Sequence, residues 1–144
     1  MSIINASHTP PTAASPDTTI FDACQLMVRD RVAAVGVVED GKLVGLFEEM
    51  DMPHKVVPQK LNPEKTLLRD VMNAQCETVT ADCSFSDALG KMLEKHVRHL
   101  PIVDADKRLL GILSIRSMME WKIDDLDNAL RGVTSYFSAD GIGG

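Results

Sequence analysis

The sequence predicts a mixed α/β fold of the α+β type, made of two tandem β-α-β-β-α units followed by a C-terminal helix. Polar residues 104–107 separate two short apolar runs, 100–103 and 109–113, which is the pattern of a β-hairpin. The same pattern occurs upstream, where Gly45 aligns with Gly111 at a distance of 66 residues. Because a unit this short cannot bury its own apolar face, the two copies are expected to pack against each other.

The first copy is expected to contain a strand, a helix, a hairpin and a second helix. Met1–Pro16 holds three prolines among Ser, Thr and Asn, so this segment should be extended rather than helical. Helical spacing of apolar residues then begins after a run of capping residues. The expected elements are a short strand at 12–14, a helix at about 20–30 capped by Asp17, Thr18 or Thr19, strands starting near Ala34 and Lys42, and a helix at 48–55 limited by Pro53 or Pro58.

The second copy repeats this order after a linker at 62–65. Its helix before the hairpin aligns with that of the first copy, since Asp87 follows Asp22 by 65 residues. Serines stand where helix caps are needed. The expected elements are a short helix at 66–72, a strand near Thr78, a helix at 84–96 capped by Ser84 or Ser86, the hairpin, and a helix from Ser114.

The C-terminal segment is expected to form a separate amphipathic helix. Between Ile123 and Phe137, apolar residues recur every three or four positions, which predicts a helix that covers an apolar face of this chain or of a partner chain. Asp140–Gly144 should be a frayed tail. These patterns divide the chain into a first repeat at 1–61, a second repeat at 62–122, and a C-terminal helix and tail at 123–144.

Composition and charge exclude several classes of protein. The 144 residues carry a formal net charge of −6, with no basic block, so electrostatic binding to nucleic acid or to an anionic membrane is not expected. One Trp, one Tyr and four Phe provide no set of aromatic residues for stacking on bases. No apolar run reaches the roughly 20 residues of a membrane-spanning helix, and no signal peptide is evident.

The reactive residue types do not assemble into a catalytic or metal-binding pattern. Cys24, Cys76 and Cys83 are odd in number and form no CxxC pair, which indicates reduced thiols in a cytoplasmic protein. His96 and His99 are spaced like a metal-binding pair, but no third ligand stands nearby, so we expect no metal site. Because no nucleophile with a base, Walker loop or GxGxxG motif is present, we expect no enzymatic activity.

The repeated motifs resemble the cystathionine-beta-synthase domain, or CBS domain, in tandem as a CBS pair or Bateman module. The second copy carries Leu-Pro-Ile-Val-Asp at 100–104 and Gly-Ile-Leu-Ser at 111–114, and the resemblance extends from about Ala13 to Met119. Several segments are similar to stand-alone bacterial CBS-pair proteins: Gly45–Phe47 with Glu49 and Asp51, Lys55-Val56, Leu68–Met72 and Val97–Pro101.

This resemblance implies two units packed with pseudo-twofold symmetry, two clefts between them, and dimerisation into a flat disc. It also implies that the clefts bind adenosine-containing ligands. In the family pattern Gly-h-x-Thr/Ser-x-x-Asp, the Asp holds the ribose hydroxyls, and the Thr or Ser contacts ribose or phosphate. The chemistry agrees, since a carboxylate accepts both hydroxyl protons and a helix start attracts an anion.

Each copy holds only half of this binding pair. The first copy has Asp51 but Glu48 at the Thr/Ser position, where a carboxylate would repel a phosphate, in part offset by Lys55. The second copy keeps Ser114 but has Ser117 at the Asp position. Arg116, with Arg98 or His99, could still meet a phosphate. The resemblance thus implies ligand contacts by Ala13, Ala34, Gly36, Glu48, Asp51 and Lys55 in the first cleft, and by Thr78, Thr80, His99, Pro101, Ser114, Arg116 and Ser117 in the second.

Structural roles for these residues stay open. Asp51 could equally be a surface charge, and Ser114 could equally be a helix cap. Glu48 is better explained as a solvated residue at a helix start, where the helix dipole favours a negative charge. Our leading interpretation is a regulatory homodimer that binds AMP, ADP, ATP, NAD or S-adenosylmethionine, requires no cofactor and acts on an unidentified protein partner by conformational change. The alternative is a protein-interaction scaffold whose clefts no longer bind a ligand.

Overall fold

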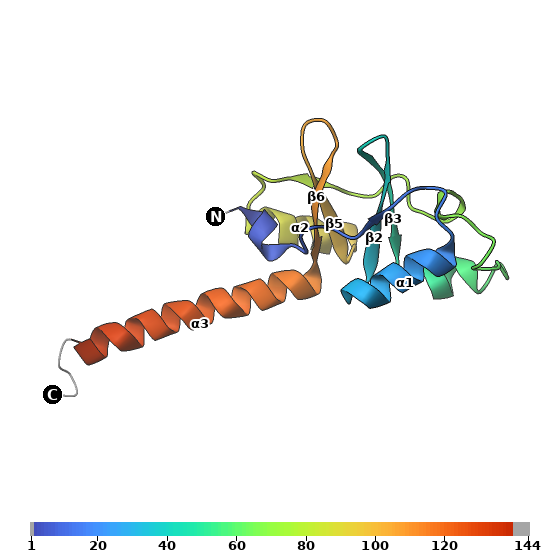
Figure 1. Ribbon diagram of the computed structural model, residues 1–144. Helices are drawn as coiled ribbons and strands as arrows, with labels where there is room; N and C mark the ends of the chain where they lie inside the picture. The colour runs from blue at the N-terminus through green and yellow to red at the C-terminus, as the bar shows by residue number, and fades with distance from the viewer. Residues whose placement is uncertain (1, 140–144) are drawn as a thin grey trace.

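The fold contains two three-stranded sheets that repeat the same topology (Figure 1). The computed structural model describes residues 2–139, with side chains through residue 134. In each sheet the short first strand pairs in parallel with the second, which pairs antiparallel with the third. The predicted fold class is therefore confirmed. The strands are β1 (Ala13–Ala14), β2 (Ala34–Glu39) and β3 (Lys42–Glu48) in one sheet, and β4 (Val79–Thr80), β5 (His99–Val103) and β6 (Leu109–Ser114) in the other.

The two helices that precede the hairpins begin and end alike. Helix α1 (Ile20–Asp30) is capped by Thr19, whose hydroxyl oxygen accepts from the Asp22 N–H at 3.2 Å. Helix α2 (Phe85–Lys95) is capped in the same way by Ser84, at 3.0 Å. Both helices end at a left-handed residue, Arg31 after α1 and His96 after α2, each with φ near 55°. The helices and caps predicted from the sequence are confirmed, with Thr19 chosen among the three candidates.

The two repeats exchange short helical turns between their cores. The 3-10 turn η1 (Ile3–Ala6) lies before the first repeat's sheet but packs in the apolar cluster of the second, with Met92 and Leu100. The 3-10 turn η3 (Leu68–Asp70) does the reverse, and Leu68 is fully buried beside Phe47. Neither sheet is therefore covered by its own stretch of sequence alone, and the division at residues 61 and 62 stays a prediction.

Three expected elements differ from the structure. The helix predicted at 48–55 is wrong in extent, because β3 continues through Glu48 and only Met52–Val56 forms a short π-helical turn, η2. The segment predicted at 66–72 is helical only over the three residues of η3. The N-terminal segment, expected to be extended throughout, contains η1, which apolar Ile3 and Ala6 anchor in the core.

The C-terminal region forms one long helix, α3 (Ile115–Ala139), instead of two (Figure 1). Its start belongs to the core, where Met118 is buried and Trp121 packs on Phe85 with ring centroids 5.3 Å apart. Beyond Trp121 the helix projects away from the two sheets, and residues 122–134 are all exposed. The expectation that this segment covers a face of this chain is thus wrong for residues 122–134. The Phe137 side chain and the Asp140–Gly144 tail lie outside the described residues.

The exchange of turns can be tested with Leu68→Ala. Removing this fully buried side chain should lower the free energy of unfolding by about 2–5 kcal/mol in urea titrations. Hydrogen exchange should speed up in α1, β2 and β3, whose residues share an apolar cluster with Leu68, although Leu68 falls in the stretch assigned to the second repeat. The matched control Val57→Ala, at an exposed site, should change stability by less than about 0.5 kcal/mol. Equal effects of the two substitutions would contradict the exchange.

Candidate functional site

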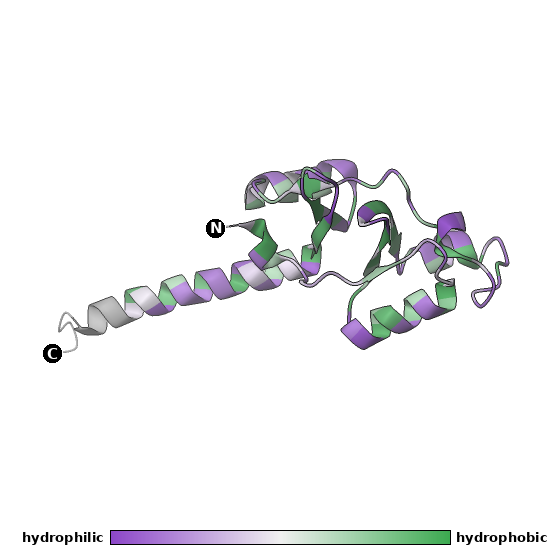
Figure 2. Ribbon diagram, turned by 45° about the horizontal axis from the view of Figure 1, so that its top comes forward, coloured by the Kyte–Doolittle hydropathy of each residue, from purple (hydrophilic) through white to green (hydrophobic). Residues whose placement is uncertain are grey.

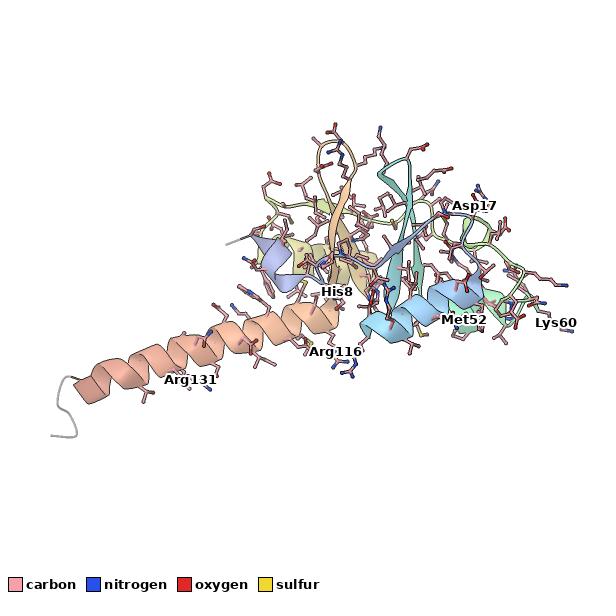
Figure 3. All side chains as sticks on the ribbon, viewed as in Figure 1. His8, Asp17, Met52, Lys60, Arg116 and Arg131 are labelled. Atoms are coloured by element: carbon pink, nitrogen blue, oxygen red, sulfur yellow. The ribbon has the colours of Figure 1, made fainter. Side chains whose placement is uncertain are left out.

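A cavity of about 750 Å³ lies between the C-terminal end of α1 and the N-terminal end of α3. Segments of both repeats form it: Arg31–Ala34 after α1, Arg98-His99 at the start of β5, and Ser114–Ser117 at the start of α3. Figure 3 labels two of its residues, His8 in front of the sheets and Arg116 in the first turn of α3. The cavity is thus an inter-repeat site of the kind that the resemblance implied.

The start of α3 is held by a reciprocal pair of serines. The Ser117 N–H donates to the Ser114 hydroxyl at 2.8 Å, and the Ser114 N–H donates to the Ser117 hydroxyl at 2.9 Å. In the first repeat, Asp51 does what Ser117 does, since its carboxylate accepts from the Glu48 N–H at 2.9 Å. Ser114 is therefore a helix cap that also faces the cavity, which joins the two roles that the sequence left open.

Positive charge dominates the polar side of the cavity. Arg31, Arg98 and Arg116 line it, against the carboxylates of Glu49 and Glu120. Arg116 pairs with Glu120 at 3.0 Å, but both side chains are largely exposed, so this ion pair holds Arg116 only weakly. Arg116 is free to turn toward an anion in the cavity.

Part of the cavity lining is apolar. Val32, Ala34 and Ile112 line it, and Ala34 and Ile112 are almost fully buried in a small cluster between the two sheets. The sheets approach closely here, because a Cβ on Gly36 would lie 2.4 Å from a methyl of Leu109. A planar group could stack on this apolar part while its polar end met the arginines.

A direct contact between the repeats occupies the position that mirrors Ser114. The His99 Nδ1 lies 2.7 Å from the Glu48 carboxylate, and the His99 side chain is only 10% exposed. Nearby, Lys55 lies 3.5 Å from Asp51 and donates to the Val71 carbonyl at 2.9 Å. The polar groups predicted for the first cleft are thus engaged with protein partners.

Five of the thirteen residues predicted to contact a ligand line the cavity, and the other eight lie elsewhere. Ala34 and His99, predicted for different clefts, line the same cavity. Those that line the cavity are Ala34, His99, Ser114, Arg116 and Ser117. Elsewhere, Pro101 is buried, Gly36 packs on Leu109, Ala13 is exposed on β1, Thr80 bonds Asp82, the Thr78 carbonyl accepts from Lys91 at 2.6 Å, and Glu48, Asp51 and Lys55 make the contacts above.

Sequence reasoning missed two polar side chains of the cavity, those of Arg31 and His8. Arg31 lies one residue past the end of α1, and its alignment with His96 marks a turn that faces the partner repeat. His8 reaches the cavity because its backbone pairs with Ile112 of β6. Only the repeat alignment could have identified Arg31, and no local signal in the sequence marked His8.

The end of α1 is fixed by a buried hydroxyl. Thr12, only 3% exposed, donates to the Asp30 carboxylate at 2.6 Å. Hydrogen bonds to the Asp30 carboxyl, mainly from the Arg29 guanidinium and secondly from the Thr12 hydroxyl, hold its pKa well below the usual range. Because Asp30 precedes Arg31, this anchor positions one of the cavity's three arginines.

The Asp30 anchor predicts a specific acid dependence of stability. Since the pKa is depressed in the folded state, the stabilisation is present above the unfolded-state pKa of about 3.9 and is lost as the pH falls through the folded-state value. The stability difference between wild type and Asp30→Asn should therefore be constant near pH 7 and shrink below about pH 4 in thermal or urea unfolding. Thr12→Val should give part of the same change. Parallel pH curves for wild type and Asp30→Asn would contradict the assignment.

Other chemistry is limited in the described part of the chain. No group of three His, Cys, Asp or Glu side chains within it could hold a metal ion. Burial raises the pKa of the Cys24, Cys76 and Cys83 thiols, which makes them weak nucleophiles. Among residues 2–139, no helix has the length and apolar character needed to cross a membrane.

The chain belongs to the CBS domain family. The family model for the CBS domain matches twice, at residues 3–54 and 68–124. An uncharacterized protein of Methanopyrus kandleri, MK0525, is 32% identical over 107 residues, which cover 74% of this chain and 55% of that protein. The crystal structure of the CBS domain protein NE2398 is 29% identical, with a TM-score of 0.76, and covers 85% of this chain and 98% of that one. The chain thus spans about half the length of the curated relative.

Two further solved structures share the fold and contain ligands. The CBS domain protein PAE2072 of Pyrobaculum aerophilum, complexed with AMP, is 22% identical with a TM-score of 0.73, over 81% of this chain and 89% of that one. The CBS domain pair of MJ0100, complexed with 5-methylthioadenosine and S-adenosylmethionine, is 21% identical with a TM-score of 0.76, over 87% and 98%. At this identity, the likeness establishes the fold of the present chain as a CBS pair.

Proposed function

We propose that this CBS pair is a non-enzymatic regulatory module that binds one adenosine-containing ligand in the inter-repeat cavity. The observation that carries the proposal is the cavity itself, which is lined by three arginines, a helix start and several apolar residues. Its volume of about 750 Å³ falls in the usual range for small-molecule sites. The adenosine ligands of PAE2072 and MJ0100 support the class of ligand.

The lining suggests how the ligand would lie. The adenine would stack against Val32, Ala34 and Ile112, where the base needs few polar partners. Phosphate groups would meet Arg31, Arg98 and Arg116, because guanidinium groups bind phosphate through paired hydrogen bonds. The ribose would then lie beside Ser114 and Ser117, with His99 close by. AMP, ADP, ATP and NAD fit this charge pattern better than the cationic S-adenosylmethionine, and no cofactor is required.

The ligand would act by joining the two repeats. Arg31 belongs to the end of α1 and Arg116 to the start of α3, so one phosphate group bridging them would favour a closed arrangement. Helix α3 projects from this point and would carry the change outward. Binding shifts the module only by its differential affinity for the two arrangements.

A scaffold without ligand is the second candidate, and one observation favours it. The Glu48 to His99 contact, with Asp51 and Lys55 beside it, leaves the first cleft's polar groups satisfied by the protein. We propose that this cleft is closed, so that Ala13 and Gly36 make no ligand contact. Thr78, Thr80 and Pro101, predicted for the second cleft, do not line the cavity and are proposed to make none either. If the protein is a scaffold, the cavity would bind no ligand either.

Exposed apolar side chains at equivalent positions support a homodimer. Val28 on α1 and Leu93 on α2 align at 65 residues, and both are largely exposed. Phe21, also on α1, is 44% exposed and adds to this apolar surface. Such residues favour association of copies through these helices. Three protonated thiols are compatible with the reducing cytoplasm, which we propose as the location.

Thermal-shift and calorimetric titrations with AMP, ADP, ATP, NAD and S-adenosylmethionine test the proposal. A ligand at a hundredfold excess over Kd should stabilise the fold by about 2.7 kcal/mol. Arg116→Ala should weaken binding of a phosphorylated ligand about tenfold or more, because it removes a charge-assisted hydrogen bond. The matched control Arg131→Ala, an arginine farther along the same helix, should bind as wild type.

Two outcomes would overturn the proposal. If none of the five ligands shifts the melting temperature of the folded protein, the scaffold reading replaces it. If a ligand binds with equal affinity to Arg116→Ala and Arg131→Ala but is lost in Asp51→Ala, the wrong cleft has been assigned.

A further inference from the structure

The projecting part of α3 carries a single line of exposed apolar side chains, here called the α3 stripe. It consists of Met119, Ile123, Leu126, Leu130 and Val133, each between 52% and 65% exposed. Figure 2 shows hydrophobic segments alternating with hydrophilic ones along this helix. Each of these side chains is more than half exposed, so no part of the described chain covers the stripe, although Met119 lies where α3 leaves the core.

The spacing of the stripe is that of a coiled coil. Its members follow one another at intervals of four, three, four and three residues, which places Ile123 and Leu130 at a positions and Met119, Leu126 and Val133 at d positions of a heptad repeat. A helix segment of this length is marginal in water without packing, and Gly132 weakens it further. The stripe therefore needs a partner helix with the same spacing.

We propose that α3 forms a parallel two-stranded coiled coil with α3 of a second copy of this chain. A second copy supplies the required heptad spacing by definition. Ile123 at an a position with Leu126 at a d position favours two strands, whereas Leu130 at a with Val133 at d does not add to that preference. This interface is separate from the surface of α1 and α2 considered above, and the proposal does not depend on ligand binding.

The flanking charges select the parallel orientation. Lys122 stands at a g position and Asp127 at the following e position, which face each other between chains in a parallel pair. Two-fold symmetry gives this contact twice, from Lys122 of each copy to Asp127 of the partner subunit. In an antiparallel pair e positions face each other, and Glu120 and Asp127 are both acidic there.

The contacts these residues make within the chain do not oppose the pairing. Lys122 lies 3.9 Å from Asp125, and Asp127 lies 3.1 Å from Arg131, all on exposed side chains. The Lys122 ammonium also lies 5.8 Å from the centre of the Phe85 ring, a weak cation–π contact at an exposed site. Such pairs contribute little and exchange readily. The remaining face is acidic, with Asp124 and Asp125, which disfavours an anionic membrane as the occupant of the stripe.

Disulfide trapping in the full-length chain tests the proposal, with Cys24, Cys76 and Cys83 changed to Ser. In a parallel coil, a cysteine at the d position 133 faces its own copy, so Val133→Cys should form covalent dimers under mild oxidation. The matched control Asn128→Cys, on the outer face of the same helix, should stay monomeric under denaturing electrophoresis over the same time. Both sites are exposed and outside the core, so neither change should affect folding.

A charge exchange provides the second measurement. Lys122→Glu should weaken self-association in sedimentation equilibrium, and the double variant Lys122→Glu with Asp127→Lys should restore it. Equal trapping of Val133→Cys and Asn128→Cys, or trapping of neither, would overturn the proposal. The proposal would also be overturned if the stripe were buried against membrane vesicles or against an antiparallel copy, since position 133 would then not cross-link to itself.

Discussion

The structure depends on the exchange of backbone between the two halves of the chain. The N-terminal segment pairs with β6 through His8 and Ile112, whose N–H and carbonyl groups bond reciprocally at 3.0 and 3.3 Å. The segment that follows η3 pairs with β3 in the same way through Asn73 and Leu46, at 3.1 and 2.9 Å. These two bridges occupy equivalent positions in the two repeats. Each is preceded in the sequence by an apolar turn, η1 before His8 and η3 before Asn73, that is buried in the core of the other repeat. Neither half can complete its core without the other.

This exchange also builds the cavity. It brings His8 to the end of β6 and holds the two sheets so that Arg31 and Arg116, more than 80 residues apart, face one space. The backbone obeys the pseudo-twofold relation, whereas the side chains break it. Ser114 and Ala34 line the cavity without contacting each other through a hydrogen bond, whereas their equivalents Glu48 and His99 are joined by one, although His99 also lines the cavity. The two equivalent positions therefore differ in chemistry.

The sequence predicted the local elements well, because their signals are local. Thr19 and Ser84 mark the helix starts, and the hairpins follow from apolar runs on either side of polar turns. The extent of the helix after β3 was wrong, because Asp51 caps the end of the strand instead of continuing a helical turn. The exchanged turns were not foreseen, since Ile3 and Leu68 bury themselves against residues far along the chain.

The site was predicted in part for the same reason. The motif positions Ser114, Arg116 and Ser117 reach the cavity, because the end of β6 fixes them locally. Which residues face them was beyond the sequence, since Arg31 and His8 arrive through the packing of the repeats. The contact between Glu48 and His99 could not be read from two residues 51 positions apart.

The central claim is that the two clefts are unequal and that one of them binds. Binding stoichiometry tests it most directly, by titrating the protein with AMP, ATP and NAD in turn and counting bound ligand per chain by equilibrium dialysis. The account predicts one ligand per chain for those that bind, with saturation unaffected by Asp51→Ala. Two ligands per chain, or none for all three nucleotides, would contradict it.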